Sequence, residues 1–275
     1  TKAIAGRPAG GDVLGPRARA VLRDIVYAAR MRAAVCTKQG SPVAPNIEFR
    51  TDWPGPGEPG PGYLQFRCLA TAFNQMDLWV GRGVPGLTLT YPRVSGCDAC
   101  GVVEKVGPGV DQSWIGQRVV YNAAIEIPEP AQPGEPPRST LAPKYELIGE
   151  HHHGAMAERV NVPAENVAVV GESADPVEAA AFGLCSLTAY SGMITKAGLR
   201  PGQSVLITGI GGGVATCAMA IARHLNCPVA VTSRHQWKLD RAKALGASLG
   251  VLDQGQDWSR EVRAWTGKRG VDLAF

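Results

Sequence analysis

A glycine-rich connection between an apolar strand and a helix constrains the second half of this chain most strongly. Ser204–Thr208 has the pattern of a short strand, Val214–Leu225 has that of an amphipathic helix, and Gly209-Ile-Gly-Gly-Gly-Val-Ala215 joins them. Glycines there permit a tight turn and let the backbone approach a pyrophosphate, which free N–H groups at the start of the helix stabilise. We therefore favour a Rossmann-type nucleotide-binding unit over a plain turn.

Strands and helices alternate throughout the region after residue 165. The pattern predicts helices at 176–184, 188–196, 238–246 and 258–266, and further strands at 229–232, 250–252 and 271–275. Such alternation is typical of parallel βαβ units. We expect residues 166–275 to form an α/β domain with a doubly wound parallel sheet.

From Met31 the chain has a different pattern of short β-type runs separated by turns. The expected strands are Met31–Cys36, Asn46–Arg50, Tyr63–Thr71, Ala99–Val106, Gln117–Tyr121, Ala155–Val162 and Val167–Val170. Runs of this length between Gly- and Pro-rich turns indicate a β-barrel-like domain. Residues 127–143 are rich in proline, and we interpret them as a solvated insertion.

The formal net charge of +4 lies entirely in residues 1–30, which carry six basic and two acidic residues. The remainder is formally neutral, so it has no basic surplus for a nucleic-acid surface. The seven cysteines are interpreted as reduced thiols, and no apolar secretory segment opens the chain. We expect a cytoplasmic protein without a membrane span; the arginines of residues 1–30 leave a mitochondrial alternative.

The end of the second strand of the α/β domain predicts the choice of cofactor. An acid about 20 residues after the glycine loop would bind the ribose 2′-OH of NAD, but Thr232-Ser233-Arg234 stands there. A short hydroxyl, Arg234 and the nearby Lys238 suit a 2′-phosphate, which predicts NADP(H). The alternative is that Arg234 and Lys238 are ordinary surface charges.

From Met31 to Phe275 the chain resembles the medium-chain dehydrogenase/reductase superfamily, specifically its zinc-type alcohol dehydrogenase and quinone oxidoreductase members. The segments that carry the resemblance include GCDACGVVEKVGPGV, AMAERVNVPAENV and LRPGQSVLITGIGGGVATCAMAIA. It implies a GroES-like catalytic domain over 31–165, a Rossmann cofactor domain over 166–275, a homodimer or homotetramer, and residues 1–30 outside the family. The cofactor domain is expected to be incomplete at its C-terminus, with four strands of about six.

The resemblance also implies a set of cofactor-binding residues and two zinc sites. The cofactor-binding positions are Thr188, Gly209, Gly211, Gly212, Gly213, Val214, Ser233, Arg234 and Lys238. At the catalytic zinc site Asn74 replaces the first thiolate, Cys97 and Asp98 stand at the second position, and Leu184 stands at the third, beside Cys185. Catalytic zinc normally has three protein ligands, so we expect none here; any zinc would use Cys97 and Asp98.

Three further patterns have simpler interpretations. The four cysteines of the family's structural zinc lobe have no counterpart in residues 127–143. Cys97 and Cys100 match C-x-x-C within an apparent strand, so buried thiols are favoured over redox chemistry. Three consecutive histidines at 151–153 cannot easily converge on one metal, and we interpret them as a polar turn.

These residues predict an NADPH-dependent, zinc-independent oxidoreductase that reduces a small-molecule quinone, enal or other α,β-unsaturated carbonyl. Asn74 would supply a hydrogen bond to the developing negative charge, and Asp77 and Asp98 would hold the polar network or relay a proton. Two alternatives stay open. One is a zinc alcohol dehydrogenase that uses Cys97 and Asp98, and the other is a non-catalytic NADPH-binding protein of the same fold.

Overall fold

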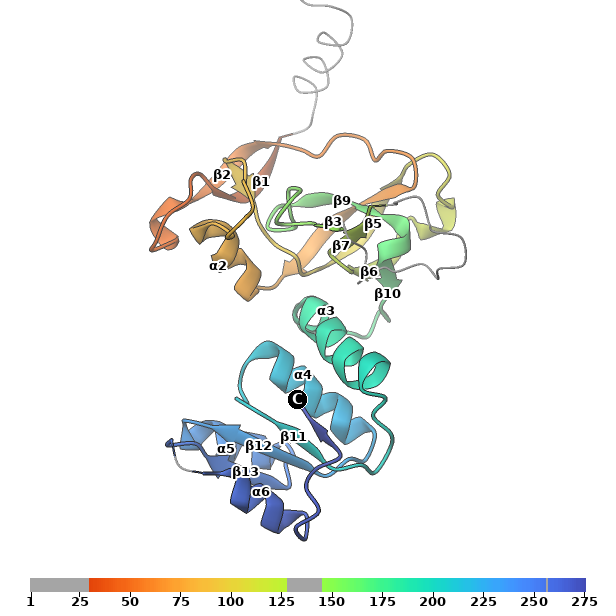
Figure 1. Ribbon diagram of the computed structural model, residues 1–275. Coiled ribbons are helices and arrows are strands. Elements are labelled where there is room, and N and C mark those ends of the chain that lie inside the picture. The colour runs from red at the N-terminus through yellow and green to blue at the C-terminus, as the bar shows by residue number, and fades with distance from the viewer. Residues whose placement is uncertain (1–29, 128–144, 256) are drawn as a thin grey trace, which may run out of the picture.

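The computed structural model describes residues 30–127, 145–255 and 257–275, which form an antiparallel β domain followed by an α/β domain (Figure 1). A five-stranded antiparallel sheet has the order β10-β6-β5-β3-β9, and a three-stranded sheet has the order β2-β1-β4. The strands of the two sheets are β1 (Arg30–Cys36), β2 (Ile47–Pro54), β3 (Tyr63–Thr71), β4 (Arg93–Val94), β5 (Ala99–Val106), β6 (Arg118–Tyr121), β9 (Arg159–Pro163) and β10 (Val167–Val169).

Alternate residues of the larger sheet form the core of the β domain. Leu64, Phe66, Val103, Val119 and Val162 are all fully buried or nearly so. The hairpin of β7 (Ala124–Glu126) and β8 (Tyr145–Leu147) extends this domain, and short 3-10 turns lie at Ala44–Asn46, Gln112–Trp114 and Ala164–Asn166. Most of the proline-rich insertion, residues 128–144, lies outside the described residues, as do residues 1–29.

Several strand boundaries differ from the sequence prediction. The expected strand 155–162 begins only at β9, because the backbone N–H groups of Ala155 and Met156 donate to Gly96 and Ser95 in an irregular segment. β2 continues past Arg50 to Pro54. β10 pairs with β6 and forms the edge of the larger sheet.

The α/β domain contains a parallel sheet of order β13-β12-β11-β14. Its strands are β11 (Val205–Ile207), β12 (Val229–Ser233), β13 (Leu249–Leu252) and β14 (Leu273–Ala274), and its helices are α4 (Gly213–His224), α5 (Gln236–Ala244) and α6 (Ser259–Trp265). This order is the Rossmann order 3-2-1-4. Helices α4 and α5 cover one face of the sheet, through residues such as Ile207, Val231 and Leu239, and α6 covers the other, through Leu206 and Val262.

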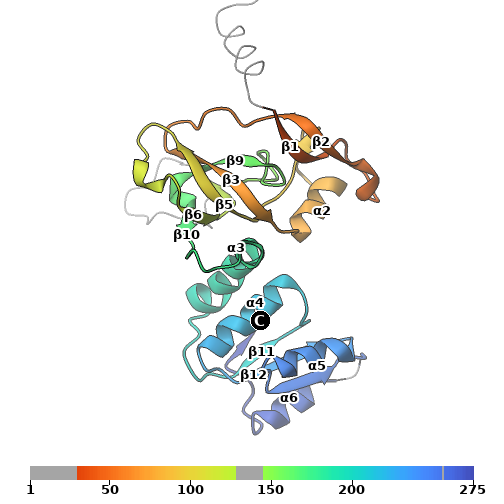
Figure 2. The same ribbon diagram turned by 180° about the vertical axis from the view of Figure 1, so that it is seen from behind.

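One continuous helix stands where two were expected. Helix α3 (Pro176–Tyr190) continues directly into a π-helical segment, η4 (Ser191–Lys196), so the predicted break between 184 and 188 is wrong. The Asp175 side chain accepts hydrogen bonds from the N–H groups of Val177 and Glu178 and starts the helix. In both views α3 lies between the two domains, and it contacts β3, β5 and α4 (Figure 2).

By length and composition alone, Pro176–Lys196 is long and apolar enough to cross a membrane. Its contacts with β3, β5 and α4 account for only part of that composition, because Val177, Phe182, Leu187 and Tyr190 are exposed.

Helix α2 (Gln75–Arg82) was not predicted. It is only eight residues long and starts with a capping box. The Asn74 Oδ1 atom accepts a hydrogen bond from the N–H of Met76, and Asp77 Oδ2 accepts one from the N–H of Asn74. The capping pair therefore fixes the position of Asn74 at the start of the helix.

Candidate functional site

The starts of α2 and α4, the middle of α3 and Asp98, which precedes β5, come together between the two domains. Asn74 Nδ2, at the start of α2, lies 3.0 Å from Asp98 Oδ2 and 3.8 Å from Cys185 Sγ on α3. Cys185 Sγ in turn lies against the start of α4, because a Cβ atom placed on Gly213 would be 2.7 Å from it. We call Asn74, Asp98, Cys185 and Gly213 the junction cluster.

Asp98 connects the β domain to the interdomain helix. Its Oδ1 atom accepts a hydrogen bond of 2.5 Å from the backbone N–H of Leu184, and the Cys97 thiol lies 3.6 Å from Oδ2. A Cβ atom on Gly183 would be 2.4 Å from Oδ1, so this approach requires glycine there. Burial raises the pKa of Asp98, while the hydrogen bonds from Leu184 and Asn74 act in the opposite direction.

Asp77 also has both carboxylate oxygens in use. It accepts hydrogen bonds from the backbone N–H groups of Asn74, at 2.7 Å, and Gly96, at 3.0 Å. Burial raises the pKa of Asp77 to about 6, and the nearby charge of Asp98 adds to the increase. The structure thus places Asp77 behind Asn74, where it orients the helix start.

The Asn74 amide can only present a donor at the junction. Its Oδ1 atom already accepts from Met76, and one hydrogen of Nδ2 points to Asp98. An amide nitrogen carries two hydrogens, and the second one faces Cys185 Sγ. An oxygen atom of a ligand that displaced this weak contact would receive a hydrogen bond from Asn74.

The residues at the family's zinc position do not fit a catalytic zinc ion. Asn74 offers an amide in place of a thiolate, and the oxygens of Asp98 are occupied by hydrogen bonds. Burial and the neighbouring carboxylates raise the pKa of Cys97, which disfavours the thiolate that zinc binds. Within residues 30–127, 145–255 and 257–275, no three His, Cys, Asp or Glu side chains are grouped so that they could hold a metal ion.

The three consecutive histidines do not converge. His151 Nδ1 accepts a hydrogen bond from the N–H of Leu147, and His153 Nδ1 accepts one from the N–H of Val94. His152 Nε2 pairs with Glu146. Each imidazole therefore has a separate partner, on β8 for His151 and His152 and on β4 for His153, in agreement with a polar turn.

The glycine loop has the geometry that an anionic cofactor requires. Gly209 and Gly211 have φ angles of 69° and 107°, a region that favours glycine. Gly212 precedes α4 without a side-chain cap, and the loop glycines are exposed. The first N–H groups of a helix have no partner within it, so the start of α4 can bind a pyrophosphate.

Thr232, a buried residue of β12, holds the other side of this loop. Its Oγ1 atom accepts a hydrogen bond from the N–H of Gly209, and its carbonyl oxygen accepts one from the N–H of Ile210. The turn that presents the glycines is thereby fixed to the sheet.

Of the residues predicted to bind a 2′-phosphate, Lys238 lies against the loop. Ser233 ends β12, Arg234 is exposed, and the Lys238 side chain crosses the loop, with its Nζ 3.3 Å from where a Cβ of Gly211 would be. Lys238 Nζ also lies 5.5 Å from the ring centroid of Trp237, a contact the sequence did not indicate. Thr188 is exposed on α3, and its hydroxyl donates to the carbonyl of Leu184.

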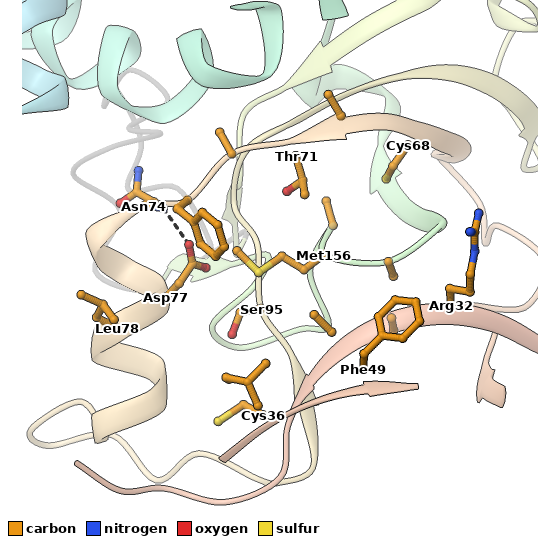
Figure 3. A pocket seen from close by; sticks show the side chains of 18 of the residues that line it. Arg32, Cys36, Phe49, Cys68, Thr71, Asn74, Asp77, Leu78, Ser95 and Met156 are labelled. Carbon is orange, nitrogen blue, oxygen red and sulfur yellow. Dashed lines mark hydrogen bonds between the residues drawn. The ribbon is translucent and has the colours of Figure 1, made fainter. Parts of the chain in front are cut away.

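A large cavity lies within the β domain, on the other side of Asn74. It has a volume of about 960 Å³, and β1, β2, β3, α2 and the segment at 155–158 line it, mainly with apolar side chains (Figure 3). Asn74 and Asp77 lie at its edge, but the Asn74 side chain points away from its centre, toward α3. The donor group of Asn74 thus faces the junction with the cofactor loop.

Sequence reasoning missed the part that Cys185 plays in this site. The resemblance placed Leu184 at the third zinc position, whereas the structure turns Cys185 toward Asn74 and uses only the backbone N–H of Leu184. The adjacent cysteine was the one signal that could have indicated it.

Comparisons with known proteins identify the families of the two domains. Residues 60–172 match the family described as alcohol dehydrogenase GroES-like domain, and residues 213–275 match the family described as zinc-binding dehydrogenase. A zinc-type alcohol dehydrogenase-like protein of Leptosphaeria maculans, YogA, is 30% identical over 208 residues, which are 72% of this chain and 56% of that protein. A 2-haloacrylate reductase of a Burkholderia species is 30% identical over 247 residues, which are 88% of this chain and 65% of the reductase.

Solved structures show the same two-domain architecture. The crystal structure of an NAD-dependent alcohol dehydrogenase has a TM-score of 0.79 and 39% identity, with coverage of 89% of this chain and 70% of that one. A mycobacterial quinone oxidoreductase has a TM-score of 0.70 and 28% identity, with coverage of 89% and 66%. The chain spans between about half and two thirds of the curated relatives named above. It belongs to the medium-chain dehydrogenase/reductase superfamily, with a GroES-like domain followed by a Rossmann-type domain.

Proposed function

We propose that this chain is the catalytic and cofactor-binding part of an NADPH-dependent, zinc-independent reductase of quinones or α,β-unsaturated carbonyls. The observation that carries the proposal is the Asn74 amide, which presents an N–H group beside the glycine loop at the position where zinc-dependent relatives have a metal ligand. The 2-haloacrylate reductase and quinone oxidoreductase relatives support this substrate class.

The mechanism depends on position and on hydrogen bonding. The nicotinamide cofactor supplies a hydride when bound, and the start of α4 would hold its pyrophosphate. Asn74 donates to the substrate oxygen on which negative charge develops, and a single donor of this kind is worth about 10²–10³ in kcat. Asp98 and Asp77 position Asn74 from two sides, through its side chain and its backbone.

The preference for NADPH rests on the end of β12. Arg234 and Lys238 are two cations near the position of a 2′-phosphate, and positions 232–234 contain no acid that could bind a ribose hydroxyl. Lys238 lies so close to Gly211 that it can reach phosphate groups on the loop as well. If both were ordinary surface charges, NADPH and NADH would bind alike.

Fluorescence titration with NADPH and NADH tests the cofactor, and elemental analysis tests the metal. We expect tighter binding of NADPH and no stoichiometric zinc. One tightly bound zinc per chain, or equal dissociation constants for the two cofactors, would contradict the corresponding part of the proposal.

The proposal includes an oligomeric state and a cellular compartment for the protein. The resemblance to the medium-chain dehydrogenase/reductase superfamily supports a homodimer or homotetramer as the assembly. All seven cysteines are free, which supports a reducing compartment such as the cytoplasm.

A further inference from the structure

We propose that the Cys185 thiol donates the proton that completes reduction of an α,β-unsaturated carbonyl at the junction cluster. The inference rests on the proposed function and assigns a catalytic residue to it. Cys185 comes from α3, between the donor group of Asn74 and the start of α4.

The position of the sulfur carries the argument. Cys185 Sγ lies 3.8 Å from Asn74 Nδ2 and in contact with Gly213, so it is next to both the oxygen-binding donor and the cofactor loop. In an α,β-unsaturated carbonyl the α-carbon is two bonds from the oxygen. A substrate whose oxygen accepts from Asn74 at about 2.9 Å therefore has its α-carbon within reach of a thiol at this place.

The other acidic groups of the site are less suitable. Asp77 and Asp98 use both carboxylate oxygens to accept hydrogen bonds from N–H groups. Cys97 is completely buried and its thiol faces Asp98. Cys185 is half-buried, and the hydrogen bond found for it among the described residues uses its sulfur as the acceptor for Asn74.

Reduction of the double bond needs no reductant other than the nicotinamide cofactor. When the β-carbon accepts hydride, the double-bond electrons move to the carbonyl oxygen, where the Asn74 N–H stabilises the enolate. The α-carbon then forms a bond to the thiol proton as the enolate returns to a carbonyl, and the thiolate regains a proton from water. Burial and, to a smaller extent, the charge of Asp98 raise the pKa of Cys185. The thiol is therefore protonated at neutral pH.

Two classes of substrate distinguish proton donation by Cys185 from a general disturbance of the site. Reduction of 1,4-benzoquinone is completed by protons on oxygen, which water supplies, whereas reduction of trans-2-hexenal needs a proton on carbon. For Cys185→Ala we expect kcat with hexenal to fall at least tenfold and kcat with benzoquinone to change less than twofold, because a general acid contributes about 10²–10⁴. Cys217→Ala, which removes a half-buried thiol from α4, is the matched control and should change neither.

A second experiment does not depend on turnover of a substrate. Alkylation of Cys185 by iodoacetamide, followed by mass spectrometry, should slow several-fold when NADPH is bound, because the thiol lies at the cofactor loop. Unchanged alkylation, or an equal loss of both activities in Cys185→Ala, would overturn the proton-donor role. Absence of turnover with both substrates in the unsubstituted protein would overturn the proposed function and this inference with it.

Discussion

Replacement of Gly183 by alanine tests the contact between Asp98 and the interdomain helix. Alanine normally stabilises a helix by about 1 kcal/mol relative to glycine. Here the new Cβ would lie 2.4 Å from Asp98 Oδ1, so the carboxylate must move away from the N–H of Leu184. Loss of a hydrogen bond to a charged group costs about 1.5–3 kcal/mol, which outweighs the gain from helix propensity. We expect Gly183→Ala to lower the free energy of unfolding by about 0.5–2 kcal/mol, the difference between these two effects.

Urea unfolding monitored by tryptophan fluorescence measures this change, and a double-mutant cycle shows its cause. In an Asp98→Ala background the Cβ has room, so Gly183→Ala should there stabilise the protein by about 1 kcal/mol. Ala181→Gly, at an exposed position of the same helix, reports the propensity effect alone. If Gly183→Ala stabilises the unsubstituted protein, Asp98 does not pack against α3 as described.

Three further outcomes follow from the site. Asn74→Ala should lower kcat/KM with benzoquinone by about 10²–10³ without a change in the dissociation constant of NADPH; a loss below threefold would remove Asn74 from the mechanism. Arg234→Ala should raise the dissociation constant of NADPH about tenfold, the size of one charge-assisted hydrogen bond, and leave that of NADH within twofold, whereas Lys238→Ala should weaken both because Lys238 also reaches the loop. Because the pKa of Asp77 is raised to about 6 in the fold, its contribution to stability is present below about pH 4 and is lost as the pH rises through 6. Urea unfolding from pH 4 to 7 should show this decrease, and Asp77→Asn should make it shallower; an unchanged slope would contradict the buried position of Asp77.

The cofactor loop was predictable because its signals are local. A strand, a glycine loop and a helix follow each other within about twenty residues, and the cations at the end of β12 are counted from the same glycines. The pairing of β12 with β11 places the end of β12 at Ser233 next to the strand that leads into the loop, and the Lys238 side chain lies against Gly211.

The junction cluster was harder to predict because long-range contacts determine it. Sequence reasoning assigned no role to Gly183, which is a glycine because Asp98, 85 residues earlier in the chain, approaches the backbone there. Successive residues of a helix differ by about 100° in direction, so a shift of one position separates Leu184 from Cys185. The Asn74 and Asp77 spacing was interpreted as chemistry alone, although it is also the capping box that starts α2.

The rate of NADPH oxidation with a quinone, measured before and after complete removal of metal by a chelator, tests the central claim most directly. The claim that Asn74 replaces a metal ion at the junction cluster predicts an unchanged rate in the metal-free protein and no increase when zinc is added. Loss of the rate on chelation, with recovery on addition of one zinc per chain, would contradict it.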